Sequence, residues 1–202
     1  MPHPSDDFLV VGVDEAGRGP LAGPVLAAAV ILDPDRPISG IGDSKTLSPQ
    51  KREKLATIIQ EQSLAWALGR AEVQEIDALN ILKAALLAME RAVLSLSIPS
   101  SSKPILVLVD GKHTPSIPFA TQAIVRGDKT VPEIGAASIL AKVTRDTEMI
   151  ALDLEYPQYG FAKHKGYPTR AHIVALQEYG PCSAHRVTFG PVRTVLSGVG
   201  DS

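Results

Sequence analysis

The sequence predicts one α/β domain in which strands and helices alternate along the chain. Two apolar runs of strand length, Phe8–Val13 and Ile105–Val109, are typical of central strands covered on both faces. Between Leu79 and Leu96, apolar residues recur at spacings of three and four, as on one face of a helix. With 202 residues, of which 45% are hydrophobic and 21% charged, the chain is long enough for one sizeable domain with a small appendage.

The first half of the chain predicts the order strand, strand, helix, strand. The run Phe8–Val13 is followed by a glycine-containing loop and then by Val25–Leu32, which is close enough to be its hairpin partner. Ser48 as an N-cap and Pro49 in the first turn predict the start of a helix. The third strand is expected at Leu64–Val73.

The second half is expected to begin with one long helix from Gln74 onward. Its core-facing stripe comprises Leu79, Leu82, Leu86, Met89, Val93 and Leu96. A loop at Pro99–Pro104 leads into the Ile105–Val109 strand, and a fifth strand is expected at Ala120–Val125.

The next helix is expected to begin at a capping box formed by Thr130 and Glu133 and to run to about Leu154. Asp128 then lies in the turn between a strand and this helix. The remaining segments are expected to be irregular at Pro157–Pro168, helical at Thr169–Tyr179 and extended or loose over about the last twenty residues.

Composition and charge exclude several classes of protein. The one cysteine, Cys182, cannot form an internal disulfide, no segment has the pattern of a signal peptide, and no apolar stretch reaches the roughly 18 residues of a membrane span. We therefore expect a cytoplasmic protein without membrane attachment. The net charge of −2 shows no overall polybasic signature. The segment Gly160–Thr194 is locally basic, which fits either a solvated surface or contact with a polyanion.

Four acids, Asp14, Glu15, Asp110 and Asp128, fall at or just beyond the ends of predicted strands. Open α/β sheets place their sites in a crevice outside strand ends, so these side chains could converge. Converging carboxylates repel one another unless a cation lies between them, and oxygen ligands without Cys or His partners favour Mg²⁺ or Mn²⁺ over zinc. Two such ions can activate a water and stabilise the leaving oxygen of a phosphodiester. The alternative is that each acid is a helix cap or part of a surface turn.

Three further segments contain residues suited to a phosphate-bearing ligand. Ala16–Pro20 places two glycines around an arginine, so its backbone can approach a ligand closely. Gly40–Thr46 fails the spacing of a Walker loop, which argues against a nucleoside triphosphatase, while Lys45 could neutralise a phosphate or remain a solvated loop lysine. One helical face, which suits phosphate contacts or a wet surface equally, carries Ser138, Lys142 and Arg145.

Several of these segments together closely resemble bacterial ribonuclease HII, a type 2 ribonuclease H. They occur in the family's order from about Val10 to Val192, which is nearly the whole chain. The matching segments are Val13–Val25, Asp43–Lys45, Val109–Gly111, Gly127–Asp128, Ala136–Asp146 and His164–Thr169.

The resemblance implies a ribonuclease-H-like α/β fold with a mixed five-stranded sheet flanked by helices. It implies a catalytic domain over residues 7–155 and a C-terminal helical or extended region over 156–202 that contacts the duplex. The implied activity is hydrolysis of the RNA strand of RNA/DNA hybrids and incision 5′ of ribonucleotides embedded in duplex DNA, leaving a 3′-hydroxyl and a 5′-phosphate. Metal-activated water would be the nucleophile, with Mn²⁺ or Mg²⁺ as cofactor. A monomer acting in DNA replication and ribonucleotide excision repair is expected.

The resemblance also assigns residues. Asp14, Glu15, Asp110 and Asp128 would be the catalytic, metal-binding acids. Substrate contacts would come from the backbone at Gly17, Arg18 and Gly19, which reads the 2′-hydroxyl, from Tyr167 against the sugar, and from Lys45, Ser138 and Lys142 at phosphates. Two positions depart from the family pattern as we expect it. Lys129, beside the last acid, either weakens metal binding or points to solvent, and Gly135 replaces an expected alanine.

Two rival functions remain open from the sequence. One is a binding module that has kept the fold and lost catalysis, against which all four acids speak. The other is a different ribonuclease-H-like enzyme, such as a recombination nuclease or a transposase. The Gly17–Gly19 loop and Tyr167 argue against that enzyme, because a nuclease acting only on DNA has no 2′-hydroxyl to read.

Overall fold

The computed structural model describes residues 7–41 and 47–198, and its centre is a mixed five-stranded sheet. The strands are β1 (Leu9–Ala16), β2 (Val25–Ile31), β3 (Ala65–Ala71), β4 (Ile105–Asp110) and β5 (Ala120–Ile124). Their spatial order is β3-β2-β1-β4-β5, with β1 antiparallel to β2, β2 antiparallel to β3, and β1, β4 and β5 parallel. The predicted fold class and strand count are confirmed.

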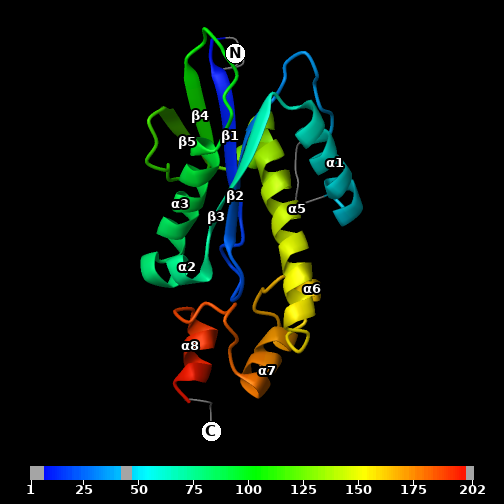
Figure 1. Cartoon of the computed structure of the whole chain (residues 1–202), viewed down its shortest axis with the longest axis vertical. Helices are drawn as coiled ribbons and strands as arrows, with labels where there is room; N and C mark the ends of the chain where they lie inside the picture. The colour runs from blue at the N-terminus through cyan, green and yellow to red at the C-terminus, as the bar shows by residue number, and fades with distance from the viewer. Residues whose placement is uncertain (1–6, 42–46, 199–202) are drawn as a thin grey trace.

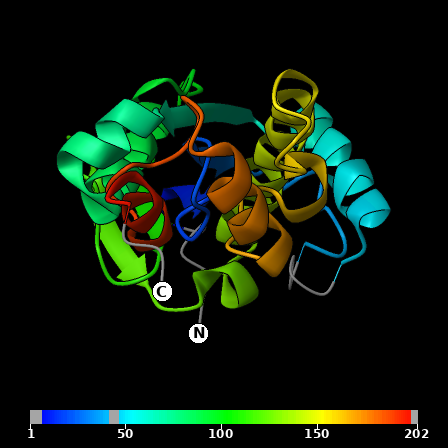
Figure 2. The ribbon, with the colours of Figure 1, turned by 90° about the horizontal axis from the view of Figure 1, so that it is seen from below.

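Helices cover both faces of the sheet and one of its ends (Figure 1). They are α1 (Pro49–Gln62), α2 (Val73–Leu79), α3 (Ile81–Leu94), α4 (Gly127–Thr130), α5 (Pro132–Glu155), α6 (Phe161–His164), α7 (Arg170–Tyr179) and α8 (Gly190–Leu196). The pair α2 and α3 lies on one side of the sheet, and α1 and α5 lie on the other. Figure 1 shows α7 and α8 below the sheet, and Figure 2, which is seen from below, shows the loop that joins β1 to β2 between these two helices.

Two glycines let the helices approach the sheet closely. A Cβ atom on Gly12 of β1 would lie 2.0 Å from the backbone carbon of Glu133 in α5. On the other face, a Cβ atom on Gly69 of β3 would lie 2.1 Å from the carbonyl oxygen of Ala88 in α3. Any side chain at these positions would therefore push a helix off the sheet.

The predicted long helix from Gln74 is wrong, because the chain breaks at Asn80. Asn80 has a positive φ of 73°, and its side-chain oxygen accepts hydrogen bonds from the amides of Leu82 and Lys83, so it caps α3. Leu79, expected in the core, is 38% exposed. The buried residues of α3 are Ala84, Ala85, Ala88, Met89, Ala92 and Val93.

Two further expectations near the chain's second half are corrected. The N-cap of α5 is Val131, followed by Pro132, so Thr130 and Glu133 form no capping box. The C-terminal segment is not entirely extended, because α8 forms there. Its buried Val192 packs in an apolar cluster with Leu21 of the β1–β2 loop, and this tertiary contact compensates for the low stability of so short a helix.

No helix within residues 7–41 and 47–198 combines the length and apolar character that crossing a bilayer requires.

Candidate active site

Asp14 and Asp110 are neighbours at the ends of two parallel central strands. The register pairs Val13 of β1 with Val109 of β4, so the two aspartates come one step later on adjacent strands. Both valines belong to the core beneath α3. Because side chains alternate along a strand, the two aspartates point to the opposite face, toward α5.

Glu15, the second-last residue of β1, completes this group. Its side chain is 11% exposed, and its Oε1 atom accepts a hydrogen bond of 3.2 Å from Arg18 Nη1. Among the described residues, nothing donates a hydrogen bond to its other oxygen, Oε2, which is buried. A buried carboxylate oxygen without a donor is the type of ligand atom that a hard cation takes.

Asp14 is electrostatically the most perturbed acid of the group. Burial raises its pKa well above the ordinary value, and the negative charges of Glu15 and Asp110 raise it further. Hydrogen bonds from the Ser138 hydroxyl and from the Glu15 amide, 2.7 Å from Asp14 Oδ1, lower the pKa but do not cancel the rise. The site therefore favours neutralisation of its charge, by a proton or by a cation.

Asp128 lies beside this group, in the helical turn α4 between β5 and α5, close to its predicted position. It is 3% exposed, and its backbone amide lies 3.4 Å from Asp110 Oδ1. It borders a separate hollow of about 200 Å³ rather than the main pocket. No three His, Cys, Asp or Glu side chains in the described ranges are already arranged as ligands of one ion. The carboxylate oxygens thus suit a hard divalent cation in type and charge. In the described residues, however, the four side chains do not surround a single ion position.

The main pocket has a volume of about 460 Å³ and joins the acids to glycines, cations and an aromatic ring. Its lining comprises Asp14, Glu15, Ala16, Gly17, Arg18, Gly19, Arg52, Asp110, Ser138, Lys142, Arg145 and Tyr167. Acids and cations in one pocket match a phosphodiester, whose negative charge the cations attract. Lys142 is partly neutralised, because its Nζ atom lies 2.7 Å from Asp146 Oδ1.

The β1–β2 loop is held by the guanidinium groups of two buried arginines. Arg145 of α5 is 1% exposed and donates to the carbonyl oxygens of Ala22, Pro24 and Lys165 at 3.0–3.1 Å. Arg145, which was expected on a phosphate-contacting helical face with Ser138 and Lys142, instead stabilises the loop through these hydrogen bonds. Gly17, with φ at +100°, leaves room for Arg145, since a Cβ there would lie 2.1 Å from Arg145 Nε.

Arg186, from the segment before α8, is 0% exposed and donates to five carbonyls of the same loop. They belong to Gly17, Arg18, Pro20, Gly23 and Pro24, at 2.6–3.3 Å. Sequence reasoning registered Arg186 only as part of a basic segment. Its partners are backbone atoms more than 160 positions away, which leave no side-chain pattern to find.

Tyr167 lies over Gly19, since a Cβ on Gly19 would lie 3.4 Å from the Tyr167 ring. Its carbonyl accepts a hydrogen bond of 2.9 Å from Nδ1 of the buried His172. His172 Nε2 lies 3.0 Å from His185 Nε2, and the Cys182 amide donates to His185 Nδ1. These partners require two neutral imidazoles, with His185 donating to His172.

The remaining predicted residues fall as follows. Lys45 lies outside the described residues. Lys129 is exposed at the rim of the hollow beside Asp128. A Cβ on Gly135 would lie 2.8 Å from a methyl carbon of Ile41, so the glycine allows that segment to pack against α5. Arg52 of α1, which lines the pocket, was not predicted as a site residue.

A model of the family described as Ribonuclease HII matches residues 11–192. This chain belongs to the ribonuclease HII family. A curated ribonuclease HII from Nitrosococcus oceani is 63% identical to it over 187 residues, which are 93% of this chain and 91% of that protein. As a member, the chain is a hydrolase, an endonuclease of the ribonuclease H type that acts on RNA/DNA substrates, and enzymes of this class depend on divalent metal ions.

Two solved structures have a fold similar to that of this chain. Ribonuclease H2 from Pyrococcus horikoshii has a TM-score of 0.76 and 28% identity, covering 94% of this chain and 97% of that chain. Bst-RNase HIII, solved in complex with Mn²⁺, has a TM-score of 0.74 over 95% of this chain and 70% of that chain. At 18% identity, the second similarity is one of fold alone.

Proposed function

We propose that this ribonuclease HII cuts the RNA strand of RNA/DNA hybrids and incises duplex DNA on the 5′ side of an embedded ribonucleotide. The products would carry a 3′-hydroxyl and a 5′-phosphate. One observation carries the proposal: a single pocket joins three strand-end carboxylates to the Gly17–Gly19 backbone and Tyr167. Chemistry on a phosphodiester thus lies beside groups able to recognise a ribose.

Asp14, Glu15, Asp110 and Asp128 are the residues that would hold Mg²⁺ or Mn²⁺. The raised pKa of Asp14 and the buried Oε2 of Glu15 support this role, since both favour a nearby cation. When bound, the ion supplies a nucleophilic water and stabilises charge on the leaving oxygen. The carboxylates orient it, and Ser138 holds Asp14 in place through its hydrogen bond.

Substrate recognition is assigned to the other residues of the pocket. The amides of the Gly17–Gly19 segment would contact the 2′-hydroxyl, and the Tyr167 ring would pack on the sugar beside it. Ser138 and Lys142 would contact backbone phosphates, and Lys45, outside the described residues, is proposed for the same task.

The molecule's wider organisation is proposed on the same basis. Residues 7–155 would form the catalytic domain, and residues 156–202 would contact the duplex through exposed basic side chains such as Arg170 and Arg193. We propose a monomer in the cytoplasm, consistent with its single cysteine, that acts in DNA replication and ribonucleotide excision repair.

The test uses three duplexes of one sequence: all-DNA, DNA with one ribonucleotide, and an RNA/DNA hybrid. With Mg²⁺ or Mn²⁺, we expect cleavage of the second and third only, with product ends as proposed, and no cleavage in EDTA. Similar rates on the all-DNA duplex would refute ribose recognition. If the hybrid is cleaved and the duplex with one ribonucleotide is not, the activity is restricted to hybrids.

A further inference from the structure

We propose that Arg186 is a positioning residue for ribose recognition, which directs the amides of Arg18 and Gly19 into the pocket by holding the preceding carbonyls. The inference rests on the proposed function, in which these amides meet the 2′-hydroxyl. It assigns to the C-terminal segment a direct influence on substrate choice.

The guanidinium of Arg186 is fully engaged with backbone. Nε donates to Gly23 at 3.0 Å, Nη1 donates to Arg18 and Pro20, and Nη2 donates to Gly17 at 2.6 Å and to two further carbonyls. No carboxylate of residues 7–41 and 47–198 forms an ion pair with it, and the Phe189 ring lies 5.1 Å from its central carbon. A buried cation that donates only to carbonyl oxygens is costly, even though the charge of Asp77, which forms no ion pair with it, favours the charged form. We infer that the guanidinium is present for a specific geometric task.

The geometry of the peptide bond transmits this contact to the pocket. In a trans peptide, the carbonyl and the following amide point in opposite directions, and the described chain contains no cis peptide. The Gly17 carbonyl faces Arg186, so the Arg18 amide points away from it. The Arg18 carbonyl also faces Arg186, so the Gly19 amide points away too.

The N–H groups of Arg18 and Gly19 have no acceptor among the described residues, unlike other N–H groups of the same loop. The amides of Leu21 and Gly23 donate to Gly166 and Ala184. Neither the Arg18 nor the Gly19 amide donates to any residue of the described chain, and both residues line the pocket. Two unused donors at a pocket wall suit an oxygen of a ligand.

Arg145 provides a matched comparison. It is an equally buried arginine, in α5, that donates to the same loop. Its carbonyl partners, however, are Ala22, Pro24 and Lys165, none of which directly precedes the Arg18 or Gly19 amide. Loosening Arg145 should therefore destabilise the protein without turning the Arg18 and Gly19 peptides.

The experiment measures, in EDTA to prevent cleavage, the Kd for two duplexes that differ by one 2′-hydroxyl. We expect Arg186→Lys to lower the preference for the ribonucleotide duplex by about tenfold, as expected for the loss of one to two hydrogen bonds, with the Kd for all-DNA little changed. Simple destabilisation would change both Kd values by the same factor and leave their ratio intact. Arg145→Lys is expected to keep the wild-type ratio.

The outcomes separate the two proposals. An unchanged ratio in a folded Arg186→Lys variant, or an equal loss in Arg145→Lys, would overturn the positioning role. Equal affinity of the wild-type protein for both duplexes would contradict the proposed function, and this inference with it. If Arg186→Lys does not fold, Phe189→Leu, which removes only the ring beside the guanidinium, should lower the ratio two- to threefold, and an unchanged ratio there overturns the role as well.

Discussion

The surroundings of Asp14 disfavour its negative charge, and the same surroundings favour the binding of a cation in its pocket. Its burial beside Glu15 and Asp110 raises its pKa, so the folded protein without metal carries an unfavourable charge.

The position of Asp14 was predictable from the sequence, because it directly follows an apolar strand. The role of Arg186 was not, because its partners are carbonyls that every residue possesses.

Asp14→Asn is expected to lower the cleavage rate at least about a hundredfold while raising stability in the absence of divalent cations. The amide removes a charge that burial and two neighbouring carboxylates oppose. Urea unfolding in EDTA should show a higher midpoint, and adding Mg²⁺ or Mn²⁺ should stabilise the variant less than the wild type. Asp35→Asn, an exposed acid outside the pocket, should change neither property, and near-normal cleavage by Asp14→Asn would remove Asp14 from the site.

Gly17→Ala is expected to cost about 2 kcal/mol or more of stability and most of the activity. The new methyl carbon would meet the Arg145 side chain at 2.1 Å, in addition to backbone strain at a φ of +100°. Gly40→Ala is the control, since Gly40 also has a positive φ but nothing lies within 4 Å of the added carbon. Equal losses of stability in the two variants, measured by urea unfolding, would show that the contact with Arg145 contributes nothing.

At the scale of elements, strands were predicted better than helix ends. Apolar runs identify β1 and β4 because central strands are buried on both faces. The break at Asn80 and the N-cap of α5 escaped prediction because spacing alone cannot show a positive φ or which of several polar residues caps a helix. The packing roles of Gly12 and Gly69 could not be predicted either, because only the structure shows which backbone atoms these glycines contact.

Gly12→Ala tests the contact between β1 and α5. The added carbon would lie 2.0 Å from backbone that cannot rotate away, so we expect a loss of about 3 kcal/mol or more, or failure to fold. Gly190→Ala, at the open start of α8, should change stability by less than about 1 kcal/mol. A Gly12→Ala variant with wild-type unfolding would show that α5 can move off the sheet at little cost.

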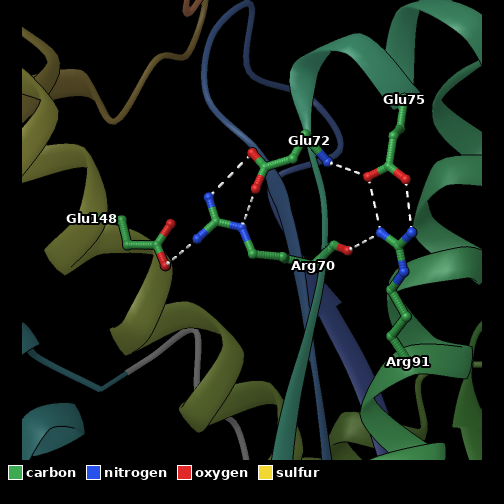
Figure 3. Close-up of polar contacts among 5 residues, drawn as sticks. All are labelled: Arg70, Glu72, Glu75, Arg91 and Glu148. Carbon is green, nitrogen blue, oxygen red and sulfur yellow. Dashed lines mark hydrogen bonds and ion pairs between the residues drawn. The ribbon is translucent and has the colours of Figure 1, made fainter.

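Charged side chains bridge the exposed edge of β3, as Figure 3 shows. Arg70 of β3 pairs with Glu72 at 2.6 Å and with Glu148 of α5 at 3.3 Å, while Arg91 of α3 donates twice to Glu75 of α2. The Arg91 partner holds the pKa of Glu75 below its usual range. Such exposed pairs each contribute at most about 1 kcal/mol. Charged side chains along an edge strand also disfavour its pairing with a strand of another molecule.

At the scale of the whole molecule, the C-terminal segment is tied to the sheet by buried groups that must stay neutral. His172 and His185 are both buried, and the two ring nitrogens that carry no proton, His172 Nε2 and His185 Nδ1, accept hydrogen bonds that an added proton would break. Burial and the neighbouring His172 lower the pKa of His185 from 6.5 to about 4. The unfolded chain therefore binds a proton at a pH where the folded protein does not.

Stability should accordingly be complete above about pH 6.5 and fall as the pH drops toward 4, by up to about 3 kcal/mol from His185. The contribution of Asp14 to stability changes with pH in the opposite direction, because the folded protein is stabilised when an acid with a raised pKa takes up a proton. The effect of His185 is therefore isolated by comparing the wild type with His185→Asn at each pH. Urea unfolding between pH 4 and 7 should show a flatter profile in His185→Asn, whereas parallel profiles would exclude the imidazole as the cause.

The β1–β2 loop follows the first strand of the sheet, yet the arginine that fills its interior is residue 186. During synthesis, all four acids leave the ribosome before that arginine does, so the loop carbonyls have no guanidinium to bind until residue 186 has emerged. Under the positioning role proposed above, ribose selection would therefore be acquired later in synthesis than the acids themselves.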